Sequence, residues 1–150
     1  RWPEHAPVFV RVSATDWADG GWNLEECVDL ARRMAAEGVD LVDCSSGGNV
    51  AHQRIPVGPG YQVPFAERIG RDTGVLTGAV GLITTPQQAA DIIAHDQADI
   101  VLLARAILRD PRWALHAAQA LGHDVSWPAQ YLRAAPAQAP ARQPWPLRLR

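Results

Sequence analysis

Cysteine is scarce in this sequence, and long apolar runs are missing. The 150 residues include two cysteines, Cys27 and Cys44, which form neither a CxxC motif nor a Cys/His metal-binding pattern. A disulfide scaffold is therefore excluded, and we expect two free, largely buried thiols and no metal. No apolar stretch approaches the ~20 residues that span a bilayer, so we expect no membrane partner.

A strong excess of one charge is also missing. The formal net charge is -2, which gives no reason to expect nucleic acid as a partner. Apolar residues make up 47% and charged residues 20%, the balance of a globular protein. Residues 1–5 contain no signal peptide and no initiator Met, so we expect a cytoplasmic protein that is a fragment or a processed product.

Complete motifs of the common catalytic sites are absent as well. No GxGxxG follows the first expected strand, which disfavours a dinucleotide-binding Rossmann fold. The histidines have no Ser, Cys or acidic partner at diagnostic spacing, and we expect His95 and His116 on the surface. Asp43 follows an apolar pair near a strand end, where a catalytic acid and a carboxylate paired with a neighbour are both open readings.

What the chain does contain is a fourfold alternation of strand and helix. The expected strands cover residues 8–12, 41–44, 75–80 and 100–103. Four βα units predict a parallel α/β fold, either an open doubly wound sheet or half of a closed barrel. The last strand is apolar throughout, which predicts a strand covered on both faces.

Local signals mark the ends of the expected helices. Asn23 and Glu26 predict a capping box before the first helix, and Thr85 and Gln88 predict a second one. Residues 38–42 resemble residues 97–101, since both place an Asp just before an apolar strand. Residues 134–150 are rich in Ala, Pro, Gln and Arg, and we expect a disordered tail there.

Three residues stand out as candidates for ligand binding. Gly81 and Arg105 follow the third and fourth strands, where parallel folds collect phosphate-binding groups; the structural alternative is a glycine turn and an Arg paired to a helix end. Arg11 interrupts an apolar strand, and its planar fork suits the edge of a flat heterocycle. A surface or ion-paired Arg is the alternative there.

Several stretches, taken in order, resemble the Old Yellow Enzyme family, in the branch of bacterial xenobiotic reductases and thermophilic-like ene-reductases. The matching stretches are residues 9–17, 38–47, 59–66, 77–84, 98–105, 108–111 and 130–133. The resemblance implies that residues 1–133 are the C-terminal half of an FMN-binding (β/α)8 TIM barrel, with strands 5–8 of that barrel.

The resemblance also implies roles for individual residues. Arg11 would contact the flavin pyrimidine edge and stabilise negative charge on the reduced ring, as a catalytic and cofactor-binding residue. The other residues implied at the cofactor are Ser45, Gln62, Gly81, Ala104 and Arg105. Among these, Gly81 and Arg105 would bind the FMN phosphate, and Ala104 stands where the family often has Gly. Arg133 resembles an arginine that reaches into the active site of a neighbouring subunit.

The implied reaction is reduction of FMN by NAD(P)H, followed by hydride transfer to an activated, α,β-unsaturated alkene. The first half of the barrel would supply the carbonyl-binding residues and the proton donor, and Cys44 does not match the flavin-tuning cysteine of the branch. We therefore expect an N-terminal half-barrel or a second copy of the chain as partner. The alternatives are a non-catalytic half-barrel that binds FMN or serves assembly, and a fragment of a phosphosugar-type barrel.

Overall fold

Strands and helices alternate along the chain in the predicted order. A computed structural model describes residues 2, 3 and 5–136. The elements are β1 (Phe9–Ser13), α1 (Leu24–Ala36), β2 (Leu41–Ser45), α2 (Val63–Thr73), β3 (Leu76–Ala79), α3 (Pro86–Ala94), β4 (Ile100–Val101), α4 (Arg105–Arg109), α5 (Trp113–Ala120) and the 3-10 helix η1 (Ala129–Ala134). Residues 137–150, most of the expected disordered tail, lie outside the described residues.

The four strands form one parallel sheet in the order β1-β2-β3-β4. Arg11 on β1 is the register partner of Asp43 on β2, and Asp43 is in turn the partner of Gly78 on β3. Each strand pairs with the next one along the chain after a helical crossover, as successive βα units do in a barrel. The predicted α/β class is confirmed, and the arrangement is consistent with part of a TIM barrel.

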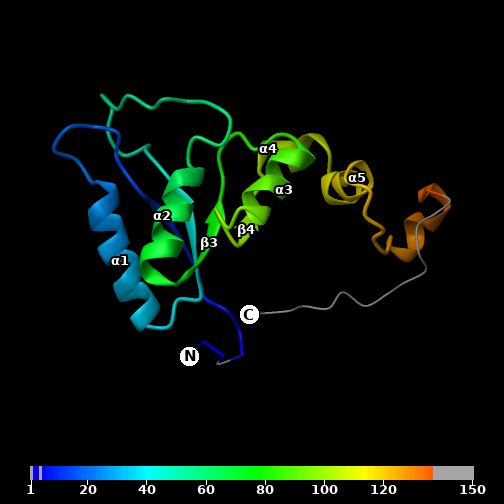
Figure 1. Ribbon diagram of the computed structural model, residues 1–150, viewed down its shortest axis with the longest axis horizontal. Coiled ribbons are helices and arrows are strands. Elements are labelled where there is room, and N and C mark those ends of the chain that lie inside the picture. Colours follow the sequence, from blue (N-terminus) through cyan, green and yellow to red (C-terminus); the bar gives the residue numbers. More distant parts are fainter. Residues whose placement is uncertain (1, 4, 137–150) are drawn as a thin grey trace.

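One face of the sheet carries the core, and the other, called the open face below, is only partly covered: Leu41 is buried there between Phe9 and Leu76. Figure 1 shows α1 and α2 side by side along the sheet, with α3 farther along it. Buried side chains of β2 and β3 pack with those of the helices, including Val42, Cys44, Ala79, Cys27, Ala31, Ala66, Ile69 and Ile92. On the opposite face Phe9 is 58% exposed and Leu76 is 42% exposed. A one-sided cover is what a barrel wall has, because its inner face needs the remaining strands.

Helix caps follow the sequence signals with one difference. The Asn23–Glu26 capping box is confirmed in both directions. At the start of α3 the Thr85 hydroxyl accepts from the Gln88 N–H, but the Gln88 side chain accepts from the Thr84 N–H instead of the N-cap. The predicted second capping box is therefore only half formed, because the Gln88 amide reaches one residue further back along the loop.

The internal sequence similarity has a structural explanation. Asp40 accepts a hydrogen bond from the Val8 N–H at 2.8 Å and donates its own N–H to the Val8 carbonyl at 3.0 Å. Asp99 makes the same two contacts with Thr77, at 2.8 and 2.9 Å. Each aspartate thus ties the start of its strand to the strand before it, and the repeated Asp marks the same joint in two βα units.

The fourth strand differs from its prediction. β4 contains only Ile100 and Val101, and both are half-buried. The expected cover on both faces was wrong for this strand, because the helices pack on one face of the sheet and both β4 residues keep part of their surface exposed. In the described part of the chain, β4 lies at the edge of the sheet and pairs with β3. Among the described residues, no helix is long and apolar enough to cross a membrane.

Candidate functional site

A pocket lies between the segments that follow β3 and β4. Its volume is about 290 Å³, and it is lined by Val80, Gly81, Leu82, Ile83, Thr84, Leu102, Leu103, Ala104, Arg105, Ala106 and Arg109. The structure therefore brings Gly81, Ala104 and Arg105 together, as the sequence predicted. Two arginines and no carboxylate line the pocket, and neither Arg105 nor Arg109 has an ion pair among the described residues. This electrostatic balance suits an anion.

Gly81 has a backbone conformation that suits a close approach. Its φ is +119°, and an added Cβ would lie 2.8 Å from the Gln62 Nε2 atom. The Gly81 carbonyl accepts from the Gly60 N–H at 3.0 Å. Within the described part of the chain, the N–H groups of Gly81 and Leu82 have no acceptor. Successive free N–H groups beside two arginines are a suitable donor set for phosphate.

Gln62 is buried beneath this loop, with 3% of its surface exposed. Its Nε2 donates to the Val80 carbonyl at 3.0 Å, and its Oε1 accepts from the Ser46 hydroxyl at 2.6 Å. The Ser46 oxygen in turn accepts from the Trp17 indole at 2.8 Å. The Gln62 amide and the Ser46 hydroxyl thus connect the loops that follow β1, β2 and β3, and Gln62 holds the segment next to Gly81 in place. The sequence did not identify Trp17 and Ser46 as site residues, because no spacing links them.

Arg11 and Ser45 meet on the open face of the sheet. The Arg11 Nη1 atom lies 3.0 Å from the Asp43 Oδ2 atom, and its Nη2 donates to the Ser45 hydroxyl at 3.3 Å. Arg11 is thus ion-paired, one of the two open readings, while 57% of its side chain remains exposed. The guanidinium can meet a ligand on this face without leaving its carboxylate.

Asp43 is the buried partner in this pair. Burial raises the pKa of its carboxyl, and the Arg11 charge opposes that effect. Its Oδ1 atom is buried and has no hydrogen-bond partner among the described residues. Of the two open readings for Asp43, the structure shows pairing with a neighbour.

Other predicted residues lie apart from this site. Arg133 is exposed on η1, which Figure 1 shows in orange far from the sheet along the longest axis of the molecule. Its role at a neighbouring subunit stays a prediction. Cys27 and Cys44 are free and buried, as predicted. Burial raises the pKa of the Cys44 thiol to about 12, so it is almost fully protonated and a poor nucleophile.

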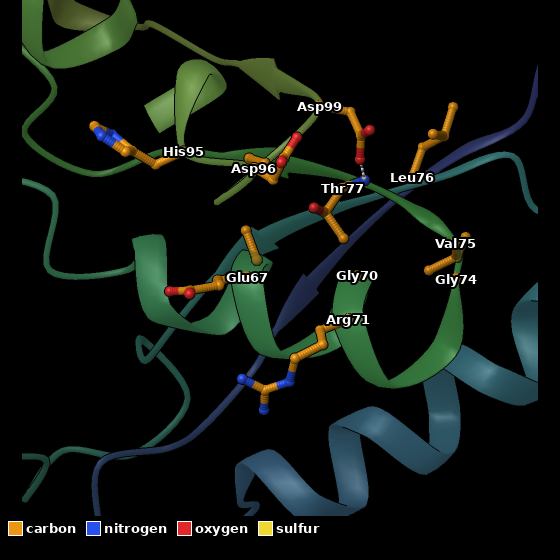
Figure 2. Close-up of a pocket in the computed structure, with 12 residues that line it drawn as sticks. Glu67, Gly70, Arg71, Gly74, Val75, Leu76, Thr77, His95, Asp96 and Asp99 are labelled. Carbon is orange, nitrogen blue, oxygen red and sulfur yellow. Dashed lines mark hydrogen bonds between the residues drawn. The ribbon is translucent and has the colours of Figure 1, made fainter. Parts of the chain in front are cut away.

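A second pocket lies between α2 and the segment that joins α3 to β4. Its volume is about 450 Å³, and Figure 2 shows Glu67 and Arg71 from α2 on one side and His95, Asp96 and Asp99 on the other. The Asp99 carboxylate accepts from the Thr77 N–H at its edge. None of the predicted cofactor residues lines this pocket.

The chain is similar to known proteins in both sequence and fold. Residues 2–124 match the model of the NADH:flavin oxidoreductase / NADH oxidase family. An NADPH dehydrogenase of Listeria innocua is 49% identical over 128 residues, and one of Geobacillus thermodenitrificans is 50% identical over 127 residues. Each match covers 85% of this chain, but the chain spans only 38% and 37% of the length of these relatives.

A solved structure of 2-naphthoyl-CoA reductase, in complex with 2-naphthoyl-CoA, has a similar fold. Its TM-score is 0.61 at 22% sequence identity, and the match covers 75% of this chain and 18% of the reductase chain. At this identity the likeness concerns the fold alone.

Proposed function

Because this chain belongs to the NADH:flavin oxidoreductase / NADH oxidase family, we propose that it forms the C-terminal half of an FMN-binding TIM barrel. Its β1 to β4 would be strands 5–8 of that barrel, and residues 1–133 would make up the half-barrel unit. The proposal rests chiefly on the pocket that joins Gly81, Ala104 and Arg105 after β3 and β4. Barrels of this kind commonly bind phosphate after their last two strands.

The residues present fit the phosphate end of FMN. Arg105 supplies a guanidinium that has no competing carboxylate in the pocket, and Arg109 lines the same pocket four residues further along α4. Gly81 would offer its N–H group, which has no acceptor among the described residues, and glycine is needed there because an added Cβ would collide with Gln62. Gln62 would keep this loop in place through its bond to the Val80 carbonyl.

The ring end would lie on the open face of the sheet. Arg11 would donate to the pyrimidine edge and stabilise negative charge there, and Ser45 would stand next to it. When bound, FMN would accept hydride from NAD(P)H and pass it to an activated alkene, the substrate class we propose. Arg133 would serve the active site of a neighbouring subunit in a homo-oligomer.

The remainder of the barrel would come from an N-terminal half-barrel. Within residues 2, 3 and 5–136, the edge strands β1 and β4 each have a neighbour on one side only. Closing the barrel would pair these edges and cover Phe9 and Leu76 on the open face. That partner would also supply the substrate-binding residues and the proton donor, so we expect this chain by itself to lack ene-reductase activity.

The test is a titration of the 150-residue chain with FMN, followed by the visible absorbance band and by quenching of flavin fluorescence. We expect FMN to bind at least tenfold more tightly than riboflavin, which lacks the phosphate, because charge-assisted hydrogen bonds to the phosphate contribute about 1.5–3 kcal/mol. Glucose 6-phosphate serves as the competitor for a phosphosugar site. Equal affinity for riboflavin, no flavin binding, or displacement by glucose 6-phosphate at equal concentration would contradict the proposal.

A further inference from the structure

We infer that Asp43 is a positioning residue, which orients the Arg11 guanidinium on the open face of the sheet and weakens its positive charge toward a bound flavin. This inference rests on the function proposed above. The family resemblance assigns no role to Asp43, and the inference comes from the contacts between β1 and β2.

The register of the two strands places Arg11 directly beside Asp43. Two contacts then determine the guanidinium's orientation: Nη1 to the Asp43 carboxylate at 3.0 Å and Nη2 to the Ser45 hydroxyl at 3.3 Å. Both acceptors belong to β2, so the planar guanidinium lies over that strand. Its other N–H groups have no acceptor among the described residues, and they remain available to a ligand.

Burial is unequal within the pair. The Asp43 side chain is 11% exposed, whereas that of Arg11 is 57% exposed. Gly78 lies on the other side of Asp43, and the Leu102 side chain fills the space over Gly78, since an added Cβ there would collide with the Leu102 Cδ1 atom. The Asp43 Oδ1 atom is buried without a partner. In the described part of the chain Arg11 is therefore the one side chain that this carboxylate binds.

The consequence concerns charge as well as orientation. An arginine without an ion pair would stabilise negative charge on the reduced flavin more strongly than Arg11 does, because the Asp43 carboxylate 3.0 Å away partly compensates the charge of Arg11. Asp43→Asn keeps the shape of the side chain and an acceptor oxygen but removes the compensating charge. We expect the variant to bind reduced FMN, relative to oxidised FMN, about tenfold more tightly, which raises the midpoint potential by about 30 mV for a two-electron couple.

The experiment uses the full chain with four variants: Asp43→Asn, Asp40→Asn, Arg11→Gln and the double variant Asp43→Asn/Arg11→Gln. Asp40→Asn is the matched control, because Asp40 lies at the other end of the same strand pair and contacts Val8. The midpoint potential of bound FMN is measured for each. A second readout needs no flavin: the rate at which a dicarbonyl reagent modifies Arg11, followed by mass spectrometry.

In wild-type chain we expect Arg11 to react several-fold more slowly than Arg105, which has no carboxylate partner among the described residues, and Asp43→Asn to remove most of that difference. The potential should rise in Asp43→Asn and stay unchanged in Asp40→Asn. It should change little when Asp43→Asn is added to the Arg11→Gln variant, because Asp43 acts through Arg11. If Asp43→Asn does not fold, the wild-type rates decide: equal reactivity of Arg11 and Arg105 contradicts the inference.

The two proposals fail in different ways. Wild-type chain that binds no FMN would overturn the proposed function and this inference with it. Two results with wild-type chain that does bind FMN would overturn the inference alone. One is a midpoint potential that Asp43→Asn leaves unchanged, and the other is a shift of the same size when Asp43→Asn is added to the Arg11→Gln variant.

Discussion

Two pockets of this molecule lie at opposite ends of the sheet and differ in charge. The pocket after β3 and β4 is lined by Arg105 and Arg109 and, as far as the chain is described, by no carboxylate. The pocket between α2 and the α3–β4 segment is larger and includes Glu67, Asp96 and Asp99 together with a single arginine. The smaller pocket therefore suits an anion, and the larger one does not.

The two ends also differ in what their polar groups do. At the amino ends of the strands, Asp40 and Asp99 are occupied by backbone N–H groups of the preceding strand. At the carboxyl ends, the N–H groups of Gly81 and Leu82 have no acceptor among the described residues. The same βα unit thus uses its polar groups for folding at one end and leaves them available for a ligand at the other, as parallel α/β folds generally do.

The largest effect is expected from Arg105→Ala. Loss of the charge-assisted bonds to the phosphate should weaken FMN binding by about 2 kcal/mol, or about thirtyfold, as measured by fluorescence titration. Arg71→Ala is the matched control, because it removes an arginine from the other pocket. An equal loss in both variants would show that overall charge, not the pocket after β4, attracts the cofactor.

A smaller effect on FMN binding is expected from Gly81→Ala. The backbone at φ +119° and the contact at 2.8 Å with Gln62 Nε2 should lower the free energy of unfolding by about 1–3 kcal/mol, measured by urea denaturation, and weaken FMN binding. Gly74→Ala is the control: its φ is +75°, but an added Cβ has no neighbour within 4 Å. If both variants lost stability equally and bound FMN equally well, the close approach at Gly81 would have no importance.

The smallest effect is expected at the amino end. Asp99→Ala should lower the free energy of unfolding by about 1 kcal/mol, because it leaves the Thr77 N–H without its carboxylate acceptor. Asp40→Ala should cost a similar amount, since Asp40 makes the equivalent contact with Val8. FMN affinity should stay within about twofold in both. A large loss of affinity in Asp99→Ala would contradict the division between the two ends of the sheet.

Much of the fold could be predicted because its signals are local. The Asn23–Glu26 capping box and the four apolar strands depend on residues close together in the chain. The expected cover on β4 was wrong, because an apolar run shows that a strand can be buried but not what packs on each of its two faces. The side chain of Gln88 was misassigned by one residue for a related reason, since loop geometry decides which N–H it reaches.

For the candidate site, the sequence by itself determined which residue types stand after which strand, and so identified Gly81, Arg105 and Arg11 as candidates. It could not determine the partners of those residues, because partners come from other strands and depend on register. The tertiary structure decided that Arg11 lies beside Asp43, that Gln62 supports the Gly81 loop, and that two arginines share one pocket without a carboxylate. Arg11 and Asp43 are 32 positions apart in the chain, and only the pairing of their strands brings them into contact.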